Sequence, residues 1–188
     1  ARGHGHADAA AHAAEGEAVR SKPRDTISAS IRAAVAAGRP AVVGFMTGGF
    51  PDRAGFRRNL AAIGGEADVV EIGVPFSDPM ADGMTIQRAS QVALRGGFTL
   101  PWLLDELRQI QPRPNAPLLL MSYLNPLLAY GLDRLPEAAV EAGVAGFIIR
   151  LGQNGIVAVA RVGRVNGDQG QIPQVGAGGK THGARGIG

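Results

Sequence analysis

The chain has 188 residues, of which 45% are apolar and 19% are charged, so it is long and apolar enough for one domain with a buried core. It contains no cysteine, which excludes disulfides, thiolate metal sites and thiol nucleophiles. The formal charge of +3 gives no reason to expect nucleic-acid binding, and no apolar run reaches the roughly 18 residues that a membrane-spanning helix needs.

The predicted elements alternate between helix and strand along the middle of the chain. In chain order we expect a helix at about 26–37, a strand at 41–46, a helix at 52–63, a strand at 68–74, helices at about 85–94 and 100–110, a strand at 117–123, a helix at 132–142 and a strand at 144–149. The strands are continuously apolar, as parallel strands covered on both faces are. The pattern therefore predicts an α/β fold with a parallel sheet, either doubly wound or part of a (β/α)₈ barrel.

The two ends of the chain differ from this middle part. Residues 1–24 are rich in Ala, Gly and His and show no periodicity, so we expect a disordered tail. Residues 151–188 hold 11 glycines and a single acidic residue, and their apolar residues are sparse. We expect this Gly-rich segment to be disordered as well, because it buries too little surface to offset its chain entropy. The folded unit is thus predicted over residues 25–150.

An acidic residue, Glu71, interrupts the apolar strand at 68–74. An unpaired buried carboxylate is costly, so its pKa is expected to rise, and the residue becomes a candidate proton carrier. Glu71 lies near the carboxyl end of the strand, where α/β folds place their catalytic residues. The alternative is an acid at a sheet edge, or one paired with an arginine.

The loop at 75–84 adds two further carboxylates, Asp78 and Asp82. Their spacing does not fit a calcium-binding loop, which needs acids at alternating positions and a glutamate at the twelfth. The segment is either a charged surface turn or a catalytic loop whose acids work beside Glu71 in general acid/base roles.

Three motifs resemble the tryptophan synthase α chain family: FMTGGFPD at 45–52, VEIGVPFSDPMADGMTIQRAS at 70–90 and LLLMSYLNPLLAYG at 118–131. The resemblance covers about residues 26–149 and implies a (β/α)₈ TIM barrel. It also implies a lyase of tryptophan biosynthesis, which cleaves indole-3-glycerol phosphate to indole and glyceraldehyde 3-phosphate by a retro-aldol reaction.

The resemblance also implies roles for individual residues. Glu71 matches the general acid/base, and Asp82 matches the carboxylate that receives the indole N–H. Phe45 and Tyr123 match residues that line the indole pocket, where flat apolar faces suit an aromatic ligand. Three further positions match the side that faces the partner subunit: Pro75, Asp78 and Asn125.

The family implies no cofactor and no metal for this chain. It implies a partner, the tryptophan synthase β chain, in an α₂β₂ heterotetramer. No secretory signal is visible, so we expect a cytoplasmic protein that binds neither nucleic acid nor membrane.

The resemblance ends abruptly at Arg150, where an Asp-hydrophobic-Pro segment is expected. Only the first four βα units are present, which predicts two open sheet edges, a Glu71 that faces water, and weak or absent activity. The alternative function is a non-catalytic fragment that only docks on the β chain. We also hypothesise that the segment after Arg150 is translated in a shifted reading frame, which reading the other frames of the coding DNA tests.

Overall fold

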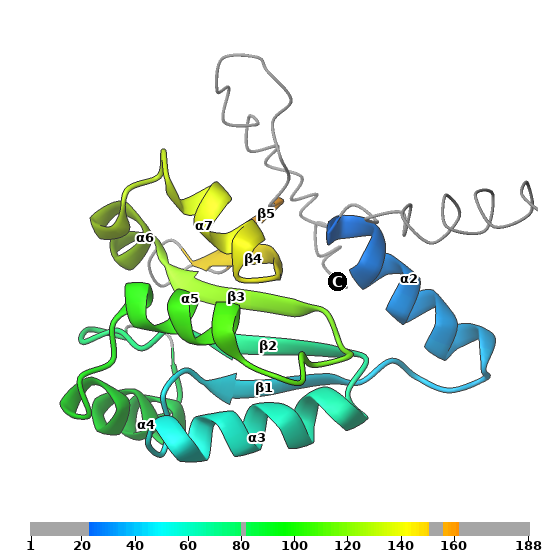
Figure 1. Ribbon diagram of the computed structural model, residues 1–188, viewed down its shortest axis with the longest axis horizontal. Helices are drawn as coiled ribbons and strands as arrows, with labels where there is room; N and C mark the ends of the chain where they lie inside the picture. The colour runs from blue at the N-terminus through cyan, green and yellow to red at the C-terminus, as the bar shows by residue number, and fades with distance from the viewer. Residues whose placement is uncertain (1–22, 80–81, 151–155, 162–188) are drawn as a thin grey trace, which may run out of the picture.

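The computed structural model describes residues 23–79, 82–150 and 156–161. Its centre is one sheet with the strand order β1-β2-β3-β4-β5 (Figure 1). The strands are β1 (Val43–Thr47), β2 (Val69–Gly73), β3 (Leu118–Tyr123), β4 (Val144–Arg150) and β5 (Ile156–Arg161). Strands β1 to β4 are parallel to their neighbours, whereas β5 pairs with β4 in the antiparallel sense. The predicted parallel α/β sheet is therefore confirmed.

Six helices lie within the described ranges, and all but the first connect parallel strands. They are α2 (Pro23–Ala36), α3 (Arg53–Glu66), α4 (Met84–Arg95), α5 (Leu100–Gln109), α6 (Leu124–Tyr130) and α7 (Leu135–Glu141). Figure 1 looks onto the sheet with α3 and α5 in front of it and α2 at the end where the parallel strands begin. None of the helices within the described ranges is long and apolar enough to span a membrane.

The hydrophobic core lies between the sheet and the helices. Because side chains alternate between the two faces of a strand, one residue from each parallel strand joins this core at the same level. These residues are Met46, Ile72, Leu120 and Phe147. Helices α3 and α5 contribute fully buried partners such as Phe56, Leu60 and Leu103. The opposite face of the sheet is free of these helices.

Asp68, just before β2, is hydrogen-bonded to the segment that leads into β1. The Arg39 guanidinium donates to both carboxylate oxygens at 2.7 Å, and the Val42 N–H donates at 2.8 Å. The Ser30 hydroxyl of α2 donates to the Asp68 carbonyl at 2.6 Å. The hydrogen bonds from Arg39 and Val42 lower the pKa of Asp68 to about 2.

This lowered pKa predicts a pH-dependent stability. The Asp68 contacts should stabilise the fold above the carboxyl's usual pKa of roughly 4 and lose this effect as the pH falls through about 2. Asp68→Asn should therefore lower the melting temperature at pH 7, and the difference from the parent should shrink toward pH 2. Circular dichroism melts across this range test it. Asp105→Asn, at an exposed surface ion pair, is the control; a constant difference for Asp68→Asn would contradict the assignment.

The structure departs from the sequence prediction at three places. Helix α3 continues through Gly64 to Glu66, and Gly64 lies so close to Pro114 that a Cβ would come within 2.7 Å of its ring. Glycine there allows close packing rather than ending the helix. Helix α6 begins directly after β3, where a loop is expected, and β5 is an element that the sequence does not predict.

The antiparallel strand β5 changes which strand forms the second edge of the sheet. The backbone of β4 is paired along its outer side by β5, from Gly146 opposite Arg161 to Arg150 opposite Ile156. Within the described residues the sheet therefore still has two edges, at β1 and at β5, and the edge expected at β4 is covered. Apart from this strand, the tails predicted at 1–24 and 151–188 lie outside the described residues, save for the first residues of α2.

Candidate active site

Glu71 lies on the face of the sheet opposite to α3 and α5. Its neighbours in β2, Val70 and Ile72, are fully buried in the core on the other face. By alternation Glu71 shares its face with its cross-strand partners, Phe45 of β1 and Leu119 of β3. The Cα of Glu71 is thus paired with an aromatic residue on one side and an aliphatic residue on the other.

This setting changes the acidity of Glu71. Burial raises the pKa of the Glu71 carboxyl, and the positive charge of Arg150 opposes that rise. The side chain is half-buried. The expectation that a partial barrel would leave Glu71 facing water, with no cause for a raised pKa, is therefore wrong. The carboxylate is partly desolvated even though the described residues form an open sheet.

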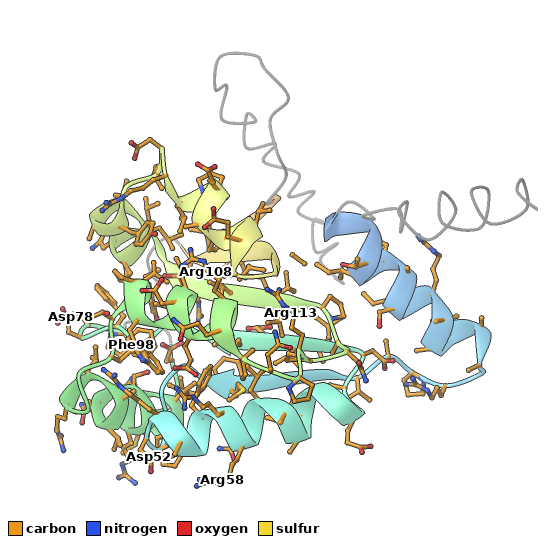
Figure 2. All side chains as sticks on the ribbon, viewed as in Figure 1. Asp52, Arg58, Asp78, Phe98, Arg108 and Arg113 are labelled. Carbon is orange, nitrogen blue, oxygen red and sulfur yellow. The ribbon has the colours of Figure 1, made fainter. Side chains whose placement is uncertain are left out.

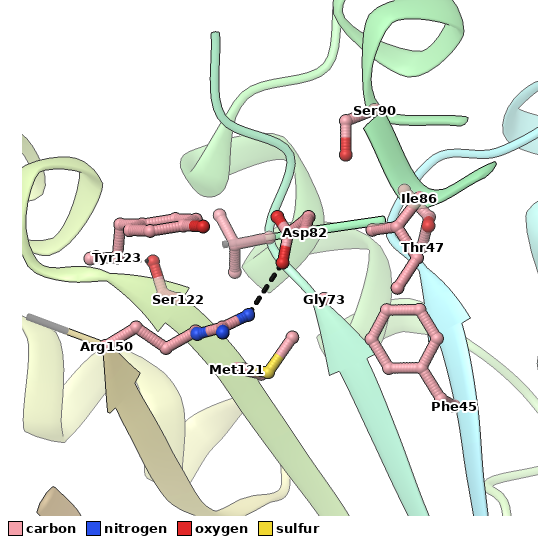
Figure 3. Close-up of a pocket in the computed structure, with 11 residues that line it drawn as sticks. Phe45, Thr47, Gly73, Asp82, Ile86, Ser90, Met121, Ser122, Tyr123 and Arg150 are labelled. Carbon is pink, nitrogen blue, oxygen red and sulfur yellow. Dashed lines mark hydrogen bonds and ion pairs between the residues drawn. The ribbon is translucent and has the colours of Figure 1, made fainter. Parts of the chain in front are cut away.

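A pocket lies at the carboxyl ends of β1 to β4, on the same face as Glu71 (Figure 3). Its lining residues are Phe45, Thr47, Gly73, Val74, Asp82, Ile86, Ser90, Met121, Ser122, Tyr123 and Arg150. Three of the four catalytic and substrate residues expected from the sequence thus meet here: Phe45, Asp82 and Tyr123. Glu71 does not line the pocket itself. It precedes the lining residue Gly73 by two positions on the same face, or roughly 6–7 Å along the strand.

Asp82 reaches the pocket from the loop that leads into α4. The Gln87 side chain donates to the Asp82 carbonyl at 2.7 Å, which ties the end of the loop to the first turns of the helix. The Asp82 carboxylate is 8% exposed and accepts a hydrogen bond from Arg150 Nη1 at 2.7 Å (Figure 3). The carboxylate is therefore held in place by a charged partner.

Sequence reasoning did not include Arg150 among the site residues. The signal was present: a cation ends an otherwise apolar strand at the position where the family resemblance breaks. The Arg150 guanidinium lies 5.7 Å from the centre of the Tyr123 ring, within the range of a cation–π contact. The polar lining residues Thr47, Ser90 and Ser122 were also missed, because nothing in their spacing distinguishes them.

The Tyr123 ring forms one aromatic wall. It lies 5.2 Å from the ring of Phe76, which comes from the loop after β2. The aromatic cluster therefore joins the end of β3 to the loop that carries Asp78 and Asp82. Phe45 lies across the pocket, on β1 (Figure 3).

The three positions expected to face a partner subunit differ in exposure. Asp78 and Asn125 are exposed, and Asp78 lies at the end of the sheet opposite α2 (Figure 2). The Ser77 hydroxyl donates to the Asp78 carboxylate at 2.7 Å. Pro75 is buried. Only Asp78 and Asn125 are thus placed to touch another chain with their side chains.

The described part of the chain holds no cluster of three or more His, Asp or Glu side chains that could ligate a metal ion.

Residues 31–150 match the family model described as "Tryptophan synthase alpha chain". The α chain of Nitratidesulfovibrio vulgaris is 51% identical over 120 residues, and that of Desulfovibrio desulfuricans is 52% identical over 120 residues. Each match covers 63% of this chain and 47% of the relative. The chain therefore spans about half the length of these relatives.

Solved structures give the same result. The tryptophan synthase of Mycobacterium tuberculosis superposes with a TM-score of 0.60 at 34% identity, covering 65% of this chain and 48% of that one. The α subunit from Legionella pneumophila superposes with a TM-score of 0.59 at 35% identity, covering 66% and 48%. The (β/α)₈ fold class is confirmed, with the described sheet corresponding to part of the barrel. The chain belongs to the tryptophan synthase α chain family.

Proposed function

We propose that this chain carries the part of a lyase active site that cleaves indole-3-glycerol phosphate into indole and glyceraldehyde 3-phosphate. The observation that carries the proposal is the placement of two carboxylates, Glu71 and Asp82, around one sheet face beside the aromatic rings of Phe45 and Tyr123. These residues lie within the stretch that matches the family.

Glu71 is the proposed proton carrier. In its protonated form it delivers a proton to C3 of the indole ring, which makes the ring an electron sink. The carboxylate then takes the proton of the hydroxyl on the adjacent glycerol carbon. The bond from that carbon to C3 breaks, its electron pair restores the neutral indole, and the carbon becomes the aldehyde. Burial raises the pKa of Glu71, which favours the protonated form that gives the proton, and the carboxylate left behind can take one.

Asp82 is the proposed electrostatic partner. Protonation at C3 places positive charge on the indole ring nitrogen, and a fixed carboxylate that accepts the N–H stabilises this charge as it develops. Phe45 and Tyr123 supply flat apolar faces for the ring.

The test of this proposal is a chimaera. Residues 26–149 are joined to the second half of the Nitratidesulfovibrio vulgaris α chain at the corresponding position, and indole release from indole-3-glycerol phosphate is measured. We expect turnover by the chimaera and little or none by the 188-residue chain. In such barrels the loops after strands seven and eight hold the phosphate, and the family match of this chain ends at residue 150. A folded but inactive chimaera would refute the proposal.

Within the same chimaera, Asp82→Asn should lower kcat about 10²–10³-fold, because one preorganised partner of the developing charge is lost. Asp78→Asn, from the same loop but with an exposed side chain, is the matched control. Equal rates for the Asp82→Asn and Asp78→Asn variants would contradict the role given to Asp82.

A second candidate function is docking on the tryptophan synthase β chain without catalysis. It is favoured by the exposure of Asp78 and Asn125 at the catalytic end of the sheet. A pull-down with the β chain, run beside the turnover assay, separates the two functions. The cytoplasmic location expected from the sequence stays a prediction.

A further inference from the structure

Arg150 occupies the pocket that the proposed function assigns to an indole ring. Its side chain is 18% exposed and that of Asp82 is 8% exposed, so the ion pair between them is largely desolvated. The guanidinium also faces the Tyr123 ring at 5.7 Å. Both groups that would receive the ligand, a carboxylate and an aromatic face, are thus already engaged by one side chain.

The space that remains in the pocket is small. About 10 Å³ is left among the lining residues, which is about what a single water molecule needs. An indole ring has nine heavy atoms and fits only if a lining side chain moves away. Arg150 is the lining residue with the longest reach, and Figure 3 shows it extending from the end of β4 toward Asp82.

We propose that Arg150 blocks this site against neutral aromatic ligands, so that the 188-residue chain discriminates against indole by an internal contact. This inference rests on the proposed function. A ring N–H that binds Asp82 must replace a hydrogen bond between two charged groups with one in which only the acceptor is charged. It must also displace the guanidinium from the Tyr123 face. Both changes cost free energy and therefore weaken the binding of indole.

The experiment is a titration of the full chain with indole, followed by isothermal calorimetry. The variants are Arg150→Ala, Arg150→Gln and a control, Arg134→Ala. Arg134 is a matched control because its guanidinium also faces a tyrosine ring, that of Tyr130 at 4.9 Å, but it does not line the pocket. We expect Arg150→Ala to bind indole at least about 10-fold more tightly than the parent, and Arg134→Ala to bind like the parent.

Comparison of the two Arg150 variants and one further double variant make the result specific. Arg150→Ala leaves Asp82 without its cation, so thermal melts check its folding; Arg150→Gln keeps an amide donor and should show the same gain in a more stable chain. Adding Asp82→Asn to Arg150→Gln should remove most of the gain, because the indole N–H loses its charged acceptor.

The possible failures are distinguishable. If the parent binds indole as tightly as the folded Arg150 variants, the blocking role is wrong while the proposed function stands. If neither the parent nor the folded variants bind indole, the blocking role is wrong, and turnover by the chimaera decides the proposed function separately. A gain that Arg134→Ala reproduces would also overturn the inference.

Discussion

Glu71→Gln should lower the rate of indole release by the chimaera about 10²–10⁴-fold, the range typical of losing a general acid/base. The amide is nearly isosteric with the carboxyl group, so it can keep the place between Phe45 and Leu119. It cannot give or take the proton that carbon–carbon cleavage requires. The loss should therefore fall on kcat, with KM little changed.

Two variants control this experiment. Glu66→Gln alters an exposed glutamate at the end of α3 and should leave the rate unchanged. Glu71→Asp keeps the carboxylate but shortens its reach, so it should recover part of the activity. A Glu71→Gln chimaera with more than about a tenth of the parent's kcat would contradict the proton-carrier role.

A stability measurement on the 188-residue chain separates this chemistry from misfolding. Burial raises the pKa of Glu71, so the folded state favours the protonated form. The stabilisation from this preference is complete below the usual pKa of roughly 4 and is lost as the pH rises through the folded value. Glu71→Gln should thus raise the melting temperature at pH 7 and lose this advantage near pH 4. A variant that is more stable yet inactive cannot have failed by unfolding.

The position of Glu71 in the sheet can be predicted because its signal is local. A carboxylate among aliphatic residues on a short strand can point only to one face or the other, and alternation with the buried Val70 and Ile72 decides which. The motifs that carry the family resemblance extend this to Asp82, Phe45 and Tyr123. The pocket brings these three together from separate elements.

The contacts that the sequence does not reveal depend on tertiary distance. Asp82 and Arg150 are 68 positions apart in the sequence. Asp82 lies on the loop after β2, and Arg150 ends β4, which is separated from β2 by one strand, so the long arginine side chain has to span this distance. Helix α6 is only seven residues long, contains Pro126 and has no side-chain cap, so the sequence around it carries little helix signal, although proline is tolerated in the first turn of a helix. Strand β5 depends on the free edge of β4, which only the folded sheet provides.

The continued burial of Glu71 changes the expectation for the partial barrel. An open sheet loses the opposite barrel wall, yet Glu71 stays half-buried, and burial still raises the pKa of its carboxyl. What an open sheet lacks is remote binding energy for the substrate phosphate. Low activity of the isolated chain would therefore reflect poor substrate positioning more than a defective proton carrier.

Phe56→Ala should destabilise the fold by about 3–5 kcal/mol, as large-to-small aromatic substitutions in cores do. Phe56 of α3 is fully buried, and its ring meets the edge of Trp102 of α5 with 5.8 Å between centroids. Trp102 in turn meets Phe98 at 5.8 Å, and Arg53 covers its ring at 5.0 Å. Removing the Phe56 ring opens a cavity at the centre of this cluster.

The size of the effect matters because the free energy of unfolding of a folded domain is only about 5–15 kcal/mol. An unpaired β1 edge and an exposed inner face, with Phe45 37% exposed, favour the lower end of that range. Phe56→Ala should therefore populate the unfolded state substantially at 37 °C. Urea denaturation followed by circular dichroism measures the loss directly, without relying on Trp102 fluorescence, which the substitution itself perturbs.

Two control variants test whether the loss of stability comes from the buried Phe56 ring. Phe56→Leu keeps most of the buried apolar surface and should cost clearly less than the alanine variant. Leu128→Ala removes a side chain of α6 that is 50% exposed, and it should change the free energy of unfolding by less than about 1 kcal/mol. A loss below about 1 kcal/mol for Phe56→Ala would show that helices α3 and α5 do not depend on this ring for their packing. The aromatic cluster would then not be what supports the sheet carrying Glu71.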